Sequence, residues 1–172
     1  MGADAPPVAV RRYSPDPQDG ETVTSTTVRE AREALIRTHF ESETAQDFDV
    51  TLATMSHPRY EIIPTGEVFD GPEEVMGYYH RSRAAFPDQR HDNVRLRHAD
   101  DAVIAEFDLL GTHLGEAYGI PPTGRTFRCP MVAFFFFDGP DGDRIICERV
   151  YFDIATIATQ LGVMPGPFGG SS

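Results

Sequence analysis

Basic residues are scarce in this sequence. Its 172 residues include 15 lysines and arginines against 27 aspartates and glutamates, which gives a formal net charge of −12 at pH 7. Nucleic acids and anionic membranes are both bound through basic protein surface. The charge balance therefore argues against nucleic acid and against a membrane as partners of this chain.

Long hydrophobic runs and cysteines are also scarce. A membrane-spanning helix needs about 20 consecutive apolar residues, and no segment approaches that length. The N-terminal segment lacks the apolar centre of a secretory signal, so we expect a cytoplasmic location. The two cysteines are expected to be reduced thiols, because a hairpin turn at 138–143 would place Cys147 opposite about Phe134, far from Cys129.

Several motifs that mark known chemistries are missing as well. The six histidines show no HExxH or paired spacing and the cysteines stand apart, so we expect no metal site. There is no Gly-x-Ser-x-Gly elbow and no dinucleotide-binding fingerprint. The segment PPTGR at 121–125 lacks the lysine of a phosphate-binding loop, and we expect a rigid turn at a cavity rim there.

The first half of the chain favours helices. Apolar residues recur at helical spacing over 28–45, 48–55 and 72–86, which predicts three helices. Residues 1–25 are rich in proline, aspartate and threonine and show no periodicity, so we expect a flexible arm. We expect 165–172 to be a flexible tail. The 40% hydrophobic content of 172 residues suits one core, so residues 26–164 are expected to form a single domain.

The second half favours strands. Alternation of apolar and polar residues predicts short strands at 60–63 and 68–69 and longer ones at 91–97, 102–113, 127–137 and 144–153. The longest strands are expected to bend or form bulges at Gly111 and Pro130. Helices followed by a meander of long strands predict an α+β fold. We expect a curved antiparallel sheet that wraps around three N-terminal helices and leaves a cone-shaped cavity.

The last predicted strand has two chemically different faces. Alternation separates Cys147, Arg149, Tyr151 and Asp153 from Ile146, Glu148, Val150 and Phe152. The second face is mostly apolar but contains Glu148, so alternation alone does not decide which face is buried.

Three segments together resemble the SnoaL-like polyketide cyclase, or ester cyclase, family of the nuclear transport factor 2-like, ketosteroid-isomerase-like superfamily. They are GTHLGEAYGIPPTGR at 111–125, YFDIATIATQLG at 151–162, and Phe86-Pro87-Asp88 between helix and sheet. The resemblance covers about residues 28–162. It implies a cone-shaped α+β barrel with an apolar pocket, often a homodimer packed through the sheet, and no metal or organic cofactor.

The resemblance also implies a chemistry. Characterised members close rings on aromatic polyketide intermediates by intramolecular aldol condensation, with a carboxylate on the last long strand as acid/base. Asp153 matches that position, which favours the face of Cys147, Arg149, Tyr151 and Asp153 as the cavity wall. This chain departs from the family pattern at Arg149, where members usually have Trp, and at Cys147, where they have an acid. It also has four phenylalanines at 134–137, where characterised cyclases place a histidine.

Asp153 and His113 are the candidate catalytic residues. A carboxylate among aromatic rings has its pKa raised by desolvation and suits a base; the alternative for Asp153 is an ion pair with Arg128 or Arg149. The His113 imidazole is expected to donate a hydrogen bond or shuttle a proton, or else to bond the loop backbone at 124–125. Other residues expected to contact the substrate are Arg149, Tyr151, Tyr60, Glu106, Asp108 and Phe135.

Glu106 and Asp108 raise a second possibility. They share one strand face, and paired carboxylates near a cavity are an acid/base arrangement. The superfamily that the chain resembles includes members that open epoxides with paired acids on neighbouring strands, so the resemblance implies this chemistry as an option. The alternative is a solvated outer face of the sheet.

Three functions follow from these candidates. The leading hypothesis is a cofactor-independent cyclase or isomerase that acts on a polyketide-like or other carbonyl-bearing apolar small molecule. The second is hydrolysis or rearrangement of an epoxide or ester, with Glu106, Asp108 and Asp153 acting together as the catalytic carboxylates. The third is a non-catalytic scaffold for small-molecule binding or dimerisation.

Overall fold

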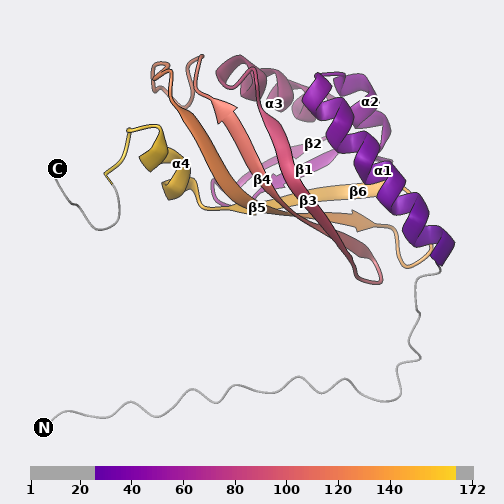
Figure 1. Ribbon diagram of the computed structural model, residues 1–172. Coiled ribbons are helices and arrows are strands. Elements are labelled where there is room, and N and C mark those ends of the chain that lie inside the picture. The colour runs from indigo at the N-terminus through magenta and orange to yellow at the C-terminus, as the bar shows by residue number, and fades with distance from the viewer. Residues whose placement is uncertain (1–25, 166–172) are drawn as a thin grey trace, which may run out of the picture.

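The computed structural model describes residues 26–165 (Figure 1). Its helices are α1 (Thr26–Ala45), α2 (Phe48–Ala53), α3 (Pro72–Ala85) and α4 (Ile154–Gln160). Its strands are β1 (Arg59–Ile62), β2 (Glu67–Asp70), β3 (Arg90–His98), β4 (Ala102–Thr112), β5 (Thr126–Phe137) and β6 (Ile145–Phe152). The expected arm at 1–25 and nearly all of the expected tail lie outside the described residues. No helix within 26–165 is both long and apolar enough to cross a membrane.

The six strands form one sheet in the order β2-β1-β6-β5-β4-β3. Most neighbours are antiparallel, but β1 and β6 run parallel, with Tyr60 beside Glu148 and Ile62 beside Val150. The predicted α+β fold is therefore confirmed, while the sheet is mixed and open at its two edges rather than wholly antiparallel. Figure 1 shows α1, α2 and α3 on one side of the curved sheet.

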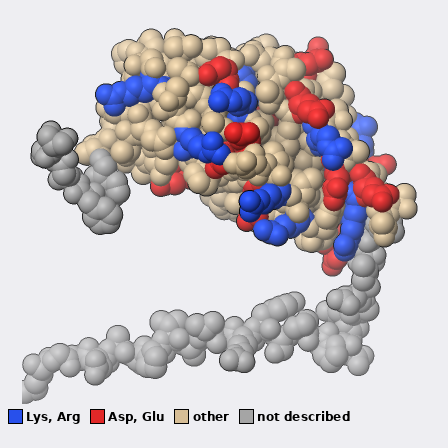
Figure 2. Space-filling model, in the orientation of Figure 1, with Lys and Arg blue, Asp and Glu red and all other residues tan. Residues whose placement is uncertain are grey.

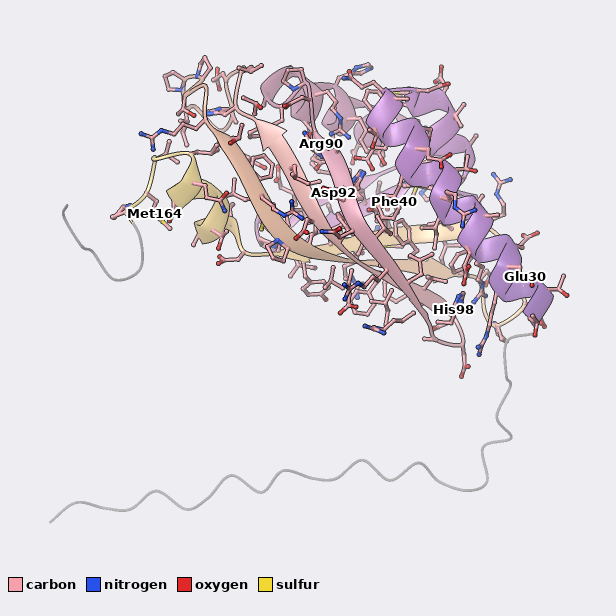
Figure 3. All side chains as sticks on the ribbon, in the orientation of Figure 1. Glu30, Phe40, Arg90, Asp92, His98 and Met164 are labelled. Atoms are coloured by element: carbon pink, nitrogen blue, oxygen red, sulfur yellow. The ribbon has the colours of Figure 1, made fainter. Side chains whose placement is uncertain are left out.

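The core lies between these helices and the concave face of the sheet. Phe40 projects from α1 toward the strands (Figure 3), and its ring centroid lies 5.1 Å from that of Phe107 and 5.5 Å from that of Phe135. Alternate residues of β4 and β5 are buried on this face: Val103, Ala105, Phe107, Leu109, Phe127, Cys129, Met131, Ala133, Phe135 and Phe137. Alternation along both strands thus places one apolar side chain inward at every second position.

The pairing of the long strands differs from prediction in detail. From Ala102 opposite Phe136 to Thr112 opposite Thr126 the β4–β5 register is unbroken, so neither Gly111 nor Pro130 forms a bulge in this pair. Gly111 instead makes room for a ring, because a Cβ there would lie 3.0 Å from Phe127. Register shifts occur in β3, between Asp92 and Arg95, and at the β5–β6 end.

The two cysteines are both free and buried, as expected. Cys147 pairs with Phe136, two residues from the position predicted, because the register shifts next to this hairpin end. Burial raises the pKa of the Cys147 thiol to about 11. The thiol is therefore protonated at neutral pH and is not a reactive nucleophile.

Arg32 joins α1 to the two hairpin turns at the far end of the sheet. It is fully buried, and its guanidinium donates to the carbonyl oxygens of Gly142 at 2.9 Å, Asp100 at 3.1 Å and Gly139 at 2.7 Å. The same group lies 4.2 Å from the ring centroid of Phe137. These contacts fix the angle at which α1 crosses the sheet.

Charges on the outside are mixed. On the face shown in Figure 2, basic side chains lie beside acidic ones instead of gathering in one patch. Arg97 forms an ion pair with Glu106 at 2.7 Å, and Arg128 forms one with Asp108 at 2.6 Å.

Candidate active site

A cavity of about 740 Å³ lies between the concave face of the sheet and helices α1, α3 and α4. Its walls are mainly apolar and aromatic: Ile62, Phe86, Leu109, Phe107, Phe127, Met131, Phe152, Ile157 and Leu161. The ionisable side chains that line it are carboxylates, imidazoles, phenols and one guanidinium: Glu43, Tyr60, Glu67, Tyr78, Arg81, His91, His113, Glu116, Tyr118 and Glu148. This volume and lining suit a small apolar ligand with a few polar groups.

The face of β6 that lines the cavity is the opposite of the face that we predicted. Glu148 and Phe152 line the cavity, and Val150 between them is fully buried. Arg149 points to the opposite side, where its Nε donates to Glu61 at 2.5 Å, and Tyr151 is 42% exposed there. The predicted cavity wall is therefore wrong, because Glu148 has a buried partner that sequence periodicity does not reveal.

Asp153 lies outside the cavity lining and caps a helix. It is the N-cap residue of α4 and its carboxylate accepts hydrogen bonds from Ala155 N at 2.9 Å and Thr156 Oγ1 at 2.7 Å. These bonds, that of Thr156 first, lower the pKa of Asp153. The expected burial and raised pKa are wrong, since Asp153 is exposed. The alternative ion pair with Arg128 or Arg149 is not formed either.

Glu106 and Asp108 are both on the outer face of the sheet. Glu106 pairs with Arg97 at 2.7 Å, and Asp108 pairs with Arg128 at 2.6 Å. Neither carboxylate lines the cavity. The hypothesis of an epoxide or ester hydrolase with these paired acids is therefore contradicted. The alternative is correct, because both acids lie on the outer face of the sheet that faces solvent.

Phe135 supports the site without lining it. Its side chain is fully buried, and its ring centroid lies 5.4 Å from that of His39 on α1. Tyr60, by contrast, lines the cavity as predicted for a substrate-contacting residue, and so does His113.

The most unusual feature of the cavity is a buried group of ionisable residues that we call the acid cluster: His39, Glu43, Arg83, His91 and Glu148. His39 Nε2 lies 3.1 Å from Glu148 Oε2 and 3.9 Å from Glu43 Oε2. His39 is completely buried and Glu148 is 2% exposed. Helix α1 supplies His39 and Glu43 one turn apart, so both point to the same side.

Hydrogen bonds fix how many protons His39 and Glu148 share. The hydroxyl of Thr54 donates to the carbonyl of Thr51 at 2.6 Å, so its oxygen accepts from His39 Nδ1 at 2.8 Å. Because Nδ1 carries a proton, the 3.1 Å contact between His39 Nε2 and Glu148 holds one further proton. That proton lies either on Nε2, facing a carboxylate, or on the carboxyl, facing a neutral ring.

The pKa values of the two partners are both raised. Burial raises the pKa of the Glu148 carboxyl, and the hydrogen bond from His39 offsets part of this effect. Burial lowers the pKa of His39, but the hydrogen bond and charge of Glu148 and the charge of Glu43 outweigh it and leave the pKa raised. A carboxylate whose pKa is raised toward neutrality is suited to taking and returning a proton.

Glu43 is held in its charged form. Burial opposes ionisation, but the charges of His91, Arg83 and His39 together lower its pKa. Arg83 contributes a direct bond from its guanidinium to Glu43 Oε1 at 2.7 Å. Burial lowers the pKa of His91. The environment thus pushes the pKa values of the two glutamates apart, which is how paired acids acquire different roles.

Tyr60 and Tyr78 add hydroxyl groups to the cavity wall beside the acid cluster. Their ring centroids lie 4.9 Å apart, and both line the cavity. Burial raises the pKa of both phenols well above the usual value. Each therefore stays protonated at neutral pH and can donate a hydrogen bond.

The rim of the cavity is formed by the loop 113–125 and the turn between β1 and β2. Tyr118 donates from its hydroxyl to Glu67 Oε2 at 3.0 Å, which joins the two segments. The backbone N–H of Gly115 donates to Ala85 O at 3.1 Å, and a Cβ at 115 would lie 2.0 Å from Ala84 O. Glycine at 115 therefore lets the loop pack directly on the end of α3.

The sequence offered one signal for the acid cluster that we did not use. His39 occurs on the apolar side of α1, between Ile36 and Phe40, and Glu148 occurs on the apolar side of β6. A buried charge is unfavourable unless it is paired. A basic residue on the apolar face of a helix and an acidic residue on the apolar face of a strand are therefore candidates for contact with each other.

Comparison with known proteins agrees with this fold. IdmH from Streptomyces antibioticus, named as a candidate polyketide cyclase, is 25% identical over 77% of this chain and 99% of its own, with a TM-score of 0.63. A candidate SnoaL-like polyketide cyclase from Jannaschia sp. CCS1 is 22% identical over 82% of this chain and 98% of its own, with a TM-score of 0.70.

A third solved structure is a hypothetical protein with a ketosteroid isomerase-like fold from Catenulispora acidiphila, determined in complex with trimethylamine. It is 17% identical over 76% of this chain and 93% of its own, with a TM-score of 0.63. Among curated proteins, none is significantly similar in sequence. The family model of the SnoaL-like polyketide cyclases matches residues 27–161. The chain belongs to the SnoaL-like polyketide cyclase family.

Proposed function

We propose that this protein is a cyclase or isomerase that enolises a polyketide-like or other carbonyl-bearing apolar small molecule, with Glu148 as the base. The observation that carries the proposal is the contact between Glu148 and the fully buried His39 in the wall of a mainly apolar cavity. Family membership supports a cyclase or isomerase, and the side chains around the cavity supply the acid–base groups.

In the proposed reaction, the Glu148 carboxylate removes a proton from the carbon next to a ketone, and the C–H electron pair becomes the enolate. In ring closure, the enolate carbon attacks a second carbonyl, and the proton on Glu148 passes to the new alkoxide oxygen. In isomerisation, the same proton returns to a different carbon. His39 remains protonated in both cases, so atoms and charge balance.

The enolate oxygen needs hydrogen-bond donors. Tyr60 and Tyr78 are protonated and line the same cavity, so we assign them to the developing negative charge. Donors that are already oriented in a water-poor site stabilise such charge more than water does.

Glu148 suits the role of base better than Glu43 does. Glu43 is bonded to Arg83 at 2.7 Å and its pKa is lowered, so it is a weak base. The charge of Glu43 helps to keep the pKa of Glu148 raised. Glu43 therefore raises the pKa of the base but does not act as the base itself.

Deuterium exchange tests the proposal. The methyl protons of 4-acetylbiphenyl lie next to its carbonyl, and their replacement in D₂O can be followed by NMR. We expect the wild type to accelerate this exchange and E148Q to slow it by at least about 100-fold, the usual contribution of a general base. D153N is the matched control, because asparagine also caps helices, and it should exchange at the wild-type rate.

The outcomes separate the hypotheses. A wild-type rate no faster than buffer, or full activity in E148Q, would refute the proposed base. Binding of 4-acetylbiphenyl without exchange would support the non-catalytic scaffold. Loss of exchange in D153N with intact folding would instead support the role that family resemblance implies for Asp153.

We also propose that two copies of the chain associate through the outer face of the sheet. Aromatic side chains gather there on β5 and β6: the Phe134 ring centroid lies 6.0 Å from that of Phe136 and 5.7 Å from that of Tyr151. All three are at least partly exposed. An apolar patch of this kind favours a self-complementary contact.

A further inference from the structure

His113 occupies a fixed position at the end of β4. Its backbone N–H donates to Arg125 O at 2.9 Å, and its carbonyl accepts from Gly124 N at 2.9 Å. The ring centroid lies 5.3 Å from that of Phe86. Backbone pairing and ring packing together hold the imidazole in one orientation.

The hydrogen bonds at Nδ1 determine where the ring proton lies. The backbone N–H of Thr123 donates to His113 Nδ1 at 3.3 Å, and the Thr123 hydroxyl lies 3.2 Å from the same atom. A backbone N–H can only donate, so Nδ1 is an acceptor. The neutral ring therefore carries its proton on Nε2.

That Nε2–H group has no partner of its own. Among residues 26–165, buried side-chain atoms without a hydrogen-bond partner occur in Tyr79, Arg83, His98, His113 and Thr159. Of these side chains, His113 is the one that lines the cavity. It is 1% exposed, so water outside the protein does not satisfy the donor. Buried donors without acceptors are unfavourable and uncommon in proteins.

His113 and the acid cluster lie at different places along the cavity. Phe107 and His113 are on the same inward side of β4, and the Phe107 ring centroid lies 5.1 Å from that of His91 in the acid cluster. Six residues separate Phe107 from His113, which corresponds to about 20 Å along an extended strand. Apolar residues such as Leu109 and Phe127 line the cavity between them.

We propose that His113 is a substrate-anchoring residue whose Nε2–H donates a hydrogen bond to an oxygen of the ligand. The substrate is then an elongated apolar molecule with two acceptor groups: a reacting carbonyl beside Glu148 and a second ketone, ester or ether oxygen at the His113 end. The assignment of the reacting end rests on the proposed function, whereas the anchoring by His113 does not.

Two matched probes test the anchor. The first, 4,4″-diacetyl-p-terphenyl, has a carbonyl at both ends of an elongated apolar body, and the second, 4-acetyl-4″-isopropyl-p-terphenyl, replaces one carbonyl group by an apolar group of similar shape. Titration calorimetry gives the dissociation constant of each. We expect the wild type to bind the diacetyl probe about five- to tenfold more tightly, as one hydrogen bond provides.

Substitutions at 113 connect that preference to the imidazole. H113F keeps a ring but removes the N–H donor, so the preference for the diacetyl probe should almost disappear. Only the small advantage of a symmetric ligand, which can bind in two equivalent orientations, should remain. H113Q keeps an N–H donor and should retain part of the preference. An equal preference in H113F and wild type, no preference in the wild type, or no binding of either probe would overturn the proposal.

A second measurement does not depend on either substitution. In protein labelled with ¹⁵N-histidine, we expect His113 to show a protonated Nε2 and an unprotonated Nδ1, and the diacetyl probe to shift the Nε2–H signal. The opposite tautomer would overturn the proposal. E148Q should keep the binding preference while it loses deuterium exchange, so failure of the base and failure of the anchor give different results.

Discussion

His39 Nε2 on α1 lies 3.1 Å from Glu148 Oε2 on β6, across a separation of 109 residues in sequence. The other ring nitrogen of His39, Nδ1, bonds Thr54 at 2.8 Å, which fixes the orientation of the imidazole. A buried carboxylate next to a buried imidazole can hold its proton on either partner. The helix therefore sets the basicity of a group that the strand presents to the cavity.

Removal of the imidazole should raise the pKa of the base further. His39 opposes the effect of burial on Glu148, so in H39L burial acts unopposed. We expect the rising limb of the deuterium-exchange rate against pH to move to higher pH, since Glu148 must lose its proton to act. H39Q, which keeps a hydrogen-bonding group, should shift less. An unchanged pH profile in H39L would contradict the coupling.

The pair should also make stability depend on pH. The pKa of His39 is raised above 6.5 in the folded chain, so folding binds this proton more tightly than the unfolded chain does. The stabilisation is complete below about pH 6.5 and is lost as pH rises through the raised pKa, and the raised pKa of Glu148 acts in the same direction. Urea unfolding from about pH 6 to about pH 9 should therefore show a steeper decline in wild type than in E148Q, which removes both the Glu148 carboxyl and the hydrogen bond that raises the pKa of His39. Parallel declines in the two proteins would contradict this expectation.

The ion pair between Glu43 and Arg83 should be needed for folding rather than for proton transfer. Both side chains are almost fully buried and lie 2.7 Å apart. R83M removes the guanidinium that bonds Glu43 and leaves only the more distant imidazoles of His39 and His91 near this carboxylate, which should cost about 3–5 kcal/mol in the free energy of unfolding. The double variant E43Q/R83M removes the uncompensated charge and should recover much of that loss. Equal stability of the two variants in urea would show that Glu43 is not charged.

Much of the fold follows from local pattern. The helices and strands expected from periodicity appear within a few residues of their predicted bounds, because each buries one regular face. Helix α4 was missed, since IATIATQ is short and weakly patterned. Asp153 with Thr156 three residues later is an N-cap arrangement, and it was interpreted as catalytic because family resemblance pointed to the same residue.

Long-range pairing accounts for the remainder. The parallel contact of β1 with β6 joins segments about 90 positions apart, and no local pattern specifies it. The choice of the inward face of β6 depends on His39, because Glu148 is tolerated inside only with a partner. Alternation alone leaves the buried face of β6 undecided because of Glu148, and in the structure this residue marks the candidate site.

Arg32 should stabilise the fold without affecting the cavity. It bonds carbonyls of Gly139, Gly142 and Asp100 in the two hairpin turns and does not line the cavity. R32M keeps the apolar stem but removes the guanidinium hydrogen bonds to these carbonyls, so we expect a loss of about 3 kcal/mol in the free energy of unfolding. Arg37 is exposed on the same helix, and R37M is the matched control. Comparable losses in both variants would exclude a special role for the turns.

Association through the outer face of the sheet can be tested by charge insertion. F134E places a carboxylate within the aromatic patch beside Tyr151, so two such faces would repel one another and lose apolar contact. Light scattering coupled to size exclusion should show a dimer for the wild type and a monomer for F134E. Val50 is 41% exposed on α2, which lies on the helical side of the sheet (Figure 1), and V50E should remain dimeric. A monomeric wild type, or a dimeric F134E, would mean that this face does not hold two copies together.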